Sequence, residues 1–252
     1  MHNGKAHDHS QPSDKAAQRG EPSYVWRAGQ ERRLALMSAH GGEAIRGKVL
    51  VDGCGVGEYL KRINQESGQA IGLDIEFERA LEAAGKGAAA LCAAGEALPF
   101  AAGSFEALLS HEVIEHVQDD RQAAREIARV LKPGGVLLMF APNRGYPFET
   151  HGVMWRGKYR FGNIPLVNYL PRRWRDKLAP HVRVYSGRDL GALFAELPMR
   201  VTFKTVLFGA YDNLIARFGK TGKFLRAVLQ GLEKTPLKAL GLSHFWVLRK
   251  DA

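Results

Sequence analysis

The feature that most constrains the fold is the alternation of short apolar runs with segments of helical periodicity between residues 47 and 143. Short apolar runs bounded by polar residues or glycine are typical of strands, whereas apolar residues spaced three and four apart are typical of helices. Regular alternation of the two predicts an α/β fold, in which a largely parallel sheet is covered by helices on both faces. The strands are predicted at 47–52, 69–74, 88–94, 105–111 and 136–143, and the helices at 57–66, 76–87 and 119–131.

The pattern changes after Asn143. Residues 144–185 hold proline, aromatic residues, arginine and histidine without clear periodicity, and the segment is too long for a plain connection. We interpret it as an insertion after the fifth strand that covers a substrate. Periodicity then returns, with a helix capped by Ser186, a strand at 200–208, a basic helix at 212–232 and a last strand at 244–250.

The chain is expected to hold one domain, preceded by a tail. Residues 1–22 are polar, so they predict a disordered tail and not a secretion signal. Its histidines, His2, His7 and His9, are expected to be mobile and not to bind metal. Within the domain (23–252), which opens with a helix at 23–39, we distinguish a core (47–143), the insertion (144–185) and a basic part that completes the sheet (186–252).

Composition indicates an ordinary globular protein, but its charge is uneven. Apolar residues make up 45% and charged residues 25% of the chain. No apolar run is long enough to span a membrane, and two cysteines do not make a disulfide framework, so we expect a cytoplasmic location. Residues 1–143 carry a net charge of −3 and residues 144–252 a net charge of +13. The basic charge therefore lies in the C-terminal part. It bears on the partner or surface that this part contacts, and not on the fold.

The first predicted strand ends in the glycine-rich stretch "LVDGCGVG" (50–57). Glycines at a strand-to-helix turn let the backbone approach a ligand and present N–H groups to it. A dinucleotide elbow has the spacing G-x-G-x-x-G, whereas here the third glycine comes one place early and Glu58 stands where a pyrophosphate would lie. A phosphate-binding loop is excluded because no Gly-Lys-Ser/Thr follows. The stretch therefore favours a nucleoside ligand without phosphates.

The second predicted strand ends in Asp74. Ligands of open α/β sheets bind at the carboxyl ends of the strands, and a carboxylate there can accept hydrogen bonds from both ribose hydroxyls. Asp74 could instead cap the following helix.

The chain resembles the class I S-adenosylmethionine-dependent methyltransferases of the type 11 group. The resemblance rests on "VLVDGCGVG", "GLDIE", "GEALPFAAGSFEALLSHEVIEHVQD" and "EIARVLKPGGVLLMFAPN", which occur in this order over about residues 47–143. It implies a Rossmann-like sheet of seven strands with the last antiparallel, and S-adenosyl-L-methionine as cofactor. It also implies that Gly53, Cys54, Gly55 and Gly57 surround the methionine end, that Asp74 holds the ribose with Ile75 beside the adenine, and that Gly95, Glu96 and Ala97 edge the adenine. Ser110 and His111 would line the floor of the site.

Asp52 departs from the family's pattern, in which an acid usually stands two residues before the first glycine. That place is Val51 here, and Asp52 is adjacent to Gly53. One residue reverses the side-chain face in a strand. Either Asp52 reaches the cofactor's ammonium group from a bent strand end, or the contact is lost. We favour the first, because a carboxylate buried without a cation is costly.

The insertion offers three candidates for a catalytic base, Glu149, His151 and His181, of which the first two are preferred. Its aromatic residues argue against disorder, although they could pack as a small subdomain. A base helps methyl transfer to oxygen, but positioning alone contributes much of the rate. His116 is interpreted as a packing or capping residue, Cys54 as a small packing residue, and no metal site is predicted.

The basic C-terminal part leaves three partners open. Residues 214–229 place apolar side chains among Arg217, Lys220, Lys223 and Arg226, which favours peripheral contact with an anionic membrane. Residues 172–175 combine arginine with tryptophan, which favours RNA, although no RNA-binding module is visible. A solvated basic surface is the third alternative. We expect methyl transfer to a small or lipid-like acceptor, at oxygen. The alternatives are an RNA or protein methyltransferase, and a protein that binds the cofactor without turnover.

Overall fold

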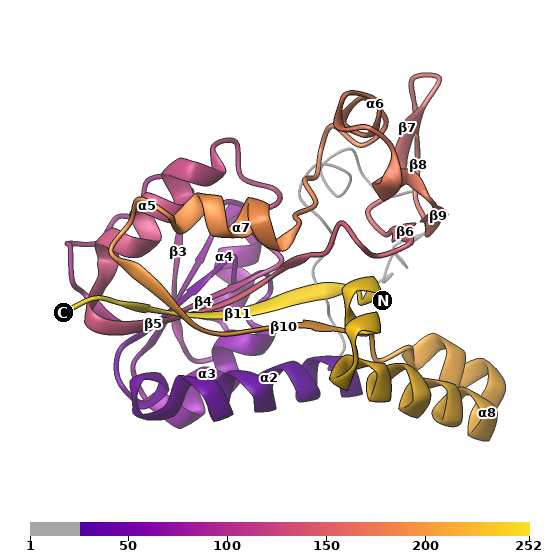
Figure 1. The fold of residues 1–252 in the computed structure, drawn as a ribbon. Coiled ribbons are helices and arrows are strands. Elements are labelled where there is room, and N and C mark those ends of the chain that lie inside the picture. The colour runs from indigo at the N-terminus through magenta and orange to yellow at the C-terminus, as the bar shows by residue number, and fades with distance from the viewer. Residues whose placement is uncertain (1–25) are drawn as a thin grey trace, which may run out of the picture.

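A seven-stranded mixed sheet forms the centre of the protein (Figure 1). The computed structural model describes residues 26–252, apart from the side chains of Asn213 and Leu214. The sheet has the order β10-β11-β5-β4-β1-β2-β3. Its strands are β1 (Val49–Asp52), β2 (Ala70–Asp74), β3 (Ala89–Cys92), β4 (Phe105–His111), β5 (Leu131–Pro142), β10 (Met199–Leu207) and β11 (Ser243–Lys250). The last strand, β11, runs antiparallel to both β5 and β10, and this confirms the predicted fold class.

Helices cover both faces of the sheet, because alternate strand residues point to opposite sides. On one face, Leu50, Leu108 and Leu137 pack with α5 (Asp120–Val130) and α7 (Gly187–Phe194). On the other face, Val51, Leu109 and Leu138 pack with the second set of helices. That set consists of α2 (Ala28–Gly41), the short helix η1 (Gly42–Arg46), α3 (Glu58–Ser67) and α4 (Phe77–Ala84). Figure 1 shows the two layers above and below the sheet.

The predicted elements agree closely with the structure, except at β5. That strand begins at Leu131, five residues before the predicted start at Val136. The "KPGG" stretch does end the preceding helix, but it then continues as strand past an irregularity in the pairing of β4 with β5. Pro133 fits there because β11 pairs with β5 only from Val136 onward, so no partner needs the missing N–H group. The predicted tail (1–22) and the start of the helix predicted at 23–39 lie outside the described residues.

The insertion folds into small elements next to the sheet. It contains β6 (Phe148–Glu149), β7 (Val153–Trp155), β8 (Lys158–Arg160), β9 (Ile164–Pro165), η2 (Val167–Tyr169) and α6 (Arg172–Leu178). β6 pairs with β9, and β7 pairs with β8. Its two ends meet: Asn143 and Tyr185 form a parallel bridge, and the Tyr185 N–H donates to the Pro142 carbonyl over 3.0 Å. The insertion therefore leaves and rejoins the sheet at neighbouring points.

The basic C-terminal part contributes α8 (Asp212–Gly231), which projects from the body of the molecule in Figure 1. The helix is interrupted at Gly219, whose φ of 52° and ψ of −118° are not helical. Two short helices, η3 (Leu232–Lys234) and η4 (Pro236–Leu240), lead from α8 to β11. Within the described part of the chain, no helix has the length and apolar character needed to cross a membrane.

Candidate functional site

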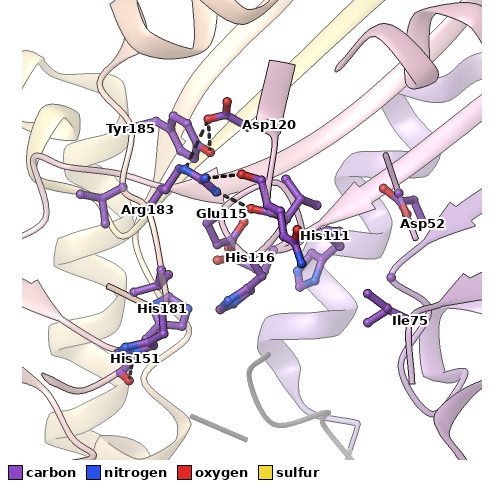
Figure 2. Close-up of a pocket in the computed structure, with 18 of the residues that line it drawn as sticks. Asp52, Ile75, His111, Glu115, His116, Asp120, His151, His181, Arg183 and Tyr185 are labelled. Carbon is purple, nitrogen blue, oxygen red and sulfur yellow. Dashed lines mark hydrogen bonds and ion pairs between the residues drawn. The ribbon is translucent and has the colours of Figure 1, made fainter. Parts of the chain in front are cut away.

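A cavity of about 1450 Å³ lies at the carboxyl ends of β1, β2 and β4. Its volume exceeds the roughly 300–1,000 Å³ of most small-molecule sites, so it can hold two ligands side by side. Figure 2 shows its labelled residues spread from Asp52 and Ile75 on one side, through His111 and His116, to His151 and His181 on the other. The first side comes from the core of the sheet and the second from the insertion.

The glycine-rich turn after β1 forms one wall of the cavity. Gly53, Gly55 and Gly57 have φ of 64°, 54° and 85°, a region that favours glycine. Gly53 and Gly55 line the cavity, and a Cβ on Gly53 would lie only 2.2 Å from Val113 Cγ2. Gly57 does not line the cavity: its Cβ would lie 2.9 Å from the Ala83 backbone. Gly57 allows the close packing of α3 on α4, and its expected contact with the cofactor stays a prediction.

Cys54 lines the same wall and is nearly buried. A Cβ on Gly72 of β2 would lie 2.8 Å from Cys54 Sγ, so the thiol packs tightly on the neighbouring strand. Burial, followed by the charges of Asp74 and Asp52, raises the pKa of Cys54 to about 12. This agrees with its interpretation as a packing residue and not a nucleophile.

Asp74 organises the glycine-rich turn from the end of β2. Its Oδ2 accepts a hydrogen bond from the Gly55 N–H over 2.9 Å, and its Oδ1 accepts one from the Glu76 N–H, also over 2.9 Å. Each carboxylate oxygen has two lone pairs, so these bonds leave acceptor capacity toward the cavity, which Asp74 lines. Asp74 thus fixes the turn and faces the cavity, and its contact with the ribose stays a prediction. It is not the N-cap of α4, which is Glu76.

Asp52 ends β1, lines the cavity and is only 3% exposed. Its Oδ1 is buried and has no hydrogen-bond partner among the described residues. Burial, followed by the negative charges of Asp74 and Glu96, raises the pKa of Asp52 to about 7. A buried carboxyl group of this kind is suited to a cationic ligand, which would supply the missing partner.

The predicted adenine edge is only partly placed at the cavity. Ile75, 47% exposed, and Gly95 both line it. Glu96 also lines it, but Glu96 Oε1 accepts a hydrogen bond from the Gln118 N–H over 2.6 Å, and this fixes the loop before α5. Ala97 lies outside the lining, because the chain turns there and its N–H donates to the Ala94 carbonyl. The expected contact of Ala97 stays a prediction, and Ala94 also lines the cavity.

Of the two residues expected on the floor, only His111 lines the cavity. Ser110 is fully buried and outside the lining, since adjacent residues of β4 point to opposite faces, and its expected role at the floor stays a prediction. His111 Nε2 lies 2.5 Å from Arg33 Nη1 of α2. Burial, followed by the charge of Arg33, lowers the pKa of His111 to about 3. His111 is therefore a neutral acceptor for the arginine.

The two preferred base candidates are joined to each other. Glu149 Oε1 lies 3.1 Å from His151 Nδ1 and accepts the His151 backbone N–H over 2.9 Å, while Glu149 Oε2 accepts from Arg175 Nη2 over 2.7 Å. Burial opposes the charge on Glu149, but the hydrogen bonds from His151 and the charge of Arg175 outweigh it and hold the pKa of Glu149 at about 2. A carboxylate this acidic is a weak base, and it is also absent from the lining, where His151 and His181 are present.

Sequence reasoning missed Arg33 and Glu115. Nothing in the sequence around Arg33 connects α2 with the end of β4. Glu115 lies within "HEVIEHV", where only the histidines were considered. It is 1% exposed, and neither of its oxygens meets a donor within residues 26–252. Burial, followed by the charge of Glu112, raises the pKa of Glu115 well above its usual range. The available signal in the sequence was an acidic residue among apolar residues, in the connection between a predicted strand and a predicted helix.

These residues fit a nucleoside ligand that carries a cation. The glycine turn leaves no room for side chains near Val113, Asp74 offers acceptors at the end of β2, and Asp52 presents a buried oxygen without a partner. Glu58 also lines the cavity, paired with Arg62 and Lys86 at 2.9 Å each. These cations offset the charge of Glu58, which was expected to repel a pyrophosphate. The argument against a dinucleotide ligand therefore rests on the spacing of the glycines.

Comparison with known proteins agrees with this geometry. Residues 50–139 match the family described as "Methyltransferase domain". An uncharacterized methyltransferase of Mycobacterium leprae is 35% identical over 140 residues, which cover 53% of this chain and 47% of the relative. A malonyl-[acyl-carrier protein] O-methyltransferase of Erwinia pyrifoliae is 34% identical over 141 residues, which cover 52% of each. The chain therefore spans about half the length of these curated relatives.

The fold is shared with solved structures at low sequence identity. An S-adenosylmethionine-dependent methyltransferase from Mesorhizobium loti superposes with a TM-score of 0.61 at 18% identity, covering 88% of this chain and 98% of that one. The cofactor expected from the resemblance, S-adenosyl-L-methionine, agrees with the family match and with these neighbours. The match over residues 50–139, the glycine turn and the strand order together support a class I S-adenosylmethionine-dependent methyltransferase.

Proposed function

We propose that this protein transfers the methyl group of S-adenosyl-L-methionine to an oxygen of a small or lipid-like acceptor. The observation that carries the proposal is the continuity of the cavity, which joins the glycine turn to the histidines of the insertion. Residues 47–143 would hold the cofactor and residues 144–185 the acceptor, so that both ligands meet in one space. When bound, the cofactor supplies a methyl group on a sulfonium sulfur.

At the cofactor end, each residue would contribute a distinct contact. Gly53 and Gly55 allow the backbone to approach the methionine part, and Asp52 pairs with its ammonium group. Asp74 accepts from the ribose hydroxyls, with Ile75 packing beside the adenine. Gly95 and Ala94 form the adenine edge. The buried Asp52 oxygen without a partner and the partly exposed Ile75 on the cavity support this arrangement.

At the acceptor end, the residues of the insertion position the oxygen that receives the methyl group. We assign His151 to this role and Glu149 to holding His151, because Glu149 accepts from His151 Nδ1 and is itself fixed by Arg175. A hydrogen on Nδ1 leaves the lone pair of His151 on Nε2, the nitrogen that can interact with an acceptor. Holding the two reactants in line contributes much of the rate enhancement of such a transfer.

The choice of oxygen rests on the relative from Erwinia pyrifoliae, which is named an O-methyltransferase. RNA is the less favoured acceptor, because the arginine cluster expected to bind it is not fully available. Arg175 is 3% exposed and paired with Glu149, whereas Trp174 beside it is 52% exposed. Both cysteines are unpaired, which supports a reducing cytoplasmic location.

A binding and transfer experiment tests the proposal. Affinity for S-adenosylmethionine is measured for the wild type, for Asp74→Ala and for Asp176→Ala, a control at the insertion side of the same cavity. We expect a loss in Asp74→Ala alone, and equal affinities would remove the ribose assignment. The chain is then incubated with methyl-labelled cofactor and cell extract that is separated into lipid, RNA and small-molecule fractions. Label in RNA rejects the acceptor class, and binding without label transfer indicates a protein without turnover.

We also propose that α8 contacts an anionic membrane surface. Its exposed apolar side chains, Phe218, Phe224, Leu225 and Val228, are 44–71% accessible to solvent. They alternate with Arg217, Lys220, Lys223 and Arg226, as in helices that lie in a membrane interface. Such a surface would bring a lipid-like acceptor close to the protein.

A further inference from the structure

Two histidines and a glutamate converge in the cavity at its acceptor end. The ligand-capable atoms of Glu115, His116 and His151 all lie within 4.8 Å of one another. Glu115 and His116 come from the turn between β4 and α5, and His151 comes from the insertion after β6. All three line the cavity, and Figure 2 shows Glu115 and His116 between Asp52 on one side and His151 on the other. Two separate parts of the chain therefore meet at this point.

The first two residues of this group have polar atoms for which the described residues supply no hydrogen-bond donor. Both Glu115 oxygens and His116 Nδ1 are buried and meet no hydrogen-bond donor within residues 26–252, and the neighbouring carboxyl group of Glu112 can pair with Glu115 only by sharing a proton. Buried polar atoms in folded proteins nearly always have a partner, and an exception calls for a specific explanation. Here the atoms without partners belong to two residues adjacent in sequence and face a shared space, so one ligand can satisfy them together.

His151 is held in the manner of a metal-binding histidine. Its Nδ1 lies 3.1 Å from Glu149 Oε1, and Glu149 is fixed from its other oxygen by the buried Arg175. Histidines that bind metals usually donate their second ring N–H to a carboxylate or carbonyl, which sets the tautomer and orients the ring. With the hydrogen on Nδ1, the lone pair that remains on Nε2 is the atom able to bind a cation.

We propose that Glu115, His116 and His151 bind one divalent transition-metal cation, with Glu149 as the partner that orients His151. Two imidazoles and one carboxylate suit ions such as Zn²⁺, Mn²⁺ or Fe²⁺ and leave coordination positions open. Ligand bonds of about 2.1 Å place two ligands of one ion at most about 4.2 Å apart. Small side-chain rotations therefore complete the set.

All three residues line the cavity, so an ion that they hold would be able to take an oxygen of the acceptor. This second statement rests on the proposed function and narrows the acceptor class to molecules whose reacting oxygen can bind a metal, such as a carboxylate or a pair of neighbouring hydroxyls. With the ion bound, His151 Nε2 would act on the acceptor through the ion and not by direct contact. Binding of the ion itself does not depend on methyl transfer, and the experiment below separates the two.

The test is equilibrium dialysis of the full chain, purified without a histidine tag, against Mn²⁺ and Zn²⁺ in turn, without cofactor or acceptor. Bound metal is measured by elemental analysis. We expect one equivalent in the wild type and a loss of affinity of at least about tenfold in both Glu115→Gln and His151→Gln. His40→Gln is the matched control, since His40 stacks on Phe203 outside the cavity and should leave binding unchanged.

The histidines of the N-terminal tail require their own control. A variant with His2, His7 and His9 changed to Ala should keep the bound ion. Loss of the ion in this variant, or wild-type affinity in both Glu115→Gln and His151→Gln, overturns the proposal. Should Glu115→Gln fail to fold, His151→Gln decides alone. Metal binding without methyl transfer would reject the proposed function and leave the metal site standing.

Discussion

Arg175 and Glu149 form an ion pair inside the insertion, with Arg175 Nη2 2.7 Å from Glu149 Oε2. Their side chains are 4% and 1% exposed. The pair joins α6 to β6, two elements whose sequences show no shared periodicity, and it fixes the carboxylate that holds His151. The conformation of the acceptor end therefore depends on a contact between two charged residues that the fold isolates from water.

Removing one partner of this pair should destabilise the protein strongly. Arg175→Met leaves Glu149 charged and buried, which costs about 3–5 kcal/mol in comparable pairs. Arg172→Met is the control, because Arg172 pairs with Asp189 over 2.5 Å but is 58% exposed, so its loss should cost under about 1 kcal/mol. Urea unfolding at pH 7 measures both changes. Equal costs for the two variants would contradict the role given to burial.

Acid should weaken the same pair. Because the pKa of Glu149 is lowered to about 2 in the folded protein from an ordinary 4.5, its contribution to stability is present above pH 4.5. The contribution is lost as the pH falls from 4.5 toward 2. The difference in unfolding free energy between the wild type and Glu149→Gln should shrink over this range. A difference that stays constant with pH would show that folding does not lower the pKa of Glu149.

Asp52 should give the opposite dependence on pH. Its pKa is raised from 3.8 to about 7, so between these values the folded chain keeps a proton that the unfolded chain has released. The resulting stability is present below about pH 4 and lost as the pH rises to 7, a change of about 4 kcal/mol. Unfolding of the wild type and Asp52→Asn at pH 4 and pH 8 measures it, and only the wild type should lose this stability at the higher pH.

Cofactor binding should follow the ionisation of Asp52. If Asp52 pairs with the ammonium group of the cofactor, only the ionised carboxylate binds it well. Affinity for S-adenosylmethionine should then rise between pH 5.5 and pH 7.5 in the wild type and change less in Asp52→Asn. Titration calorimetry at several pH values measures both curves. Identical curves would mean that Asp52 does not contact the ammonium group.

The glycine turn should tolerate no side chain at Gly53. Gly53→Ala places a Cβ 2.2 Å from Val113 Cγ2 at a φ of +64°, whereas Gly68→Ala meets the same backbone conformation, φ +68°, with nothing within 4 Å. Gly68→Ala should cost about 1–2 kcal/mol from the backbone alone. Gly53→Ala should cost about 1–3 kcal/mol more and reduce cofactor affinity. Thermal unfolding compares them, and Val113→Ala should restore part of the loss.

Membrane contact through α8 should depend on charge. Lys220 and Lys223 lie among exposed apolar side chains, so attraction to anionic lipid should add to the insertion of those side chains. The double variant Lys220→Glu and Lys223→Glu should sediment less with anionic vesicles, and the wild type should be released by salt. The control is the exposed pair Lys158→Glu and Arg156→Glu in the insertion. Binding that ignores both salt and Lys220/Lys223→Glu would exclude this surface.

The sheet could be predicted from the sequence because its strands carry continuous apolar runs between polar or glycine-rich turns. β4 was predicted with its observed limits, Phe105–His111, and Ser186 caps α7 as expected. β5 was predicted too short, because proline and glycine normally end a strand. Pro133 is tolerated because no β11 residue pairs with β5 at that point, and this is known only from the assembled sheet. The glycine turn and Asp74 were located for the same reason as the sheet, because each follows a strand end.

The acceptor end was harder to predict, because its residues meet through tertiary contacts. Glu149 looked like a base until its pairing with Arg175 was known, and nothing near Arg33 in the sequence points toward His111. Ser110 and His111 are neighbours in sequence, but the strand sends them to opposite faces. Residues that touch across the insertion leave no periodic signal, so their pairing emerges only from the folded chain.

The junction between Asn143 and Tyr185 bears on how such proteins diversify. The insertion starts and finishes at one hydrogen-bonded point. The length of the segment between these two ends therefore does not alter the sheet. A descendant could lengthen, shorten or exchange the residues between these two positions while the glycine turn and Asp74 stay in place. If the insertion binds the acceptor as proposed, selection can change the acceptor separately from the glycine turn, and grafting a foreign segment between the same two residues would test this.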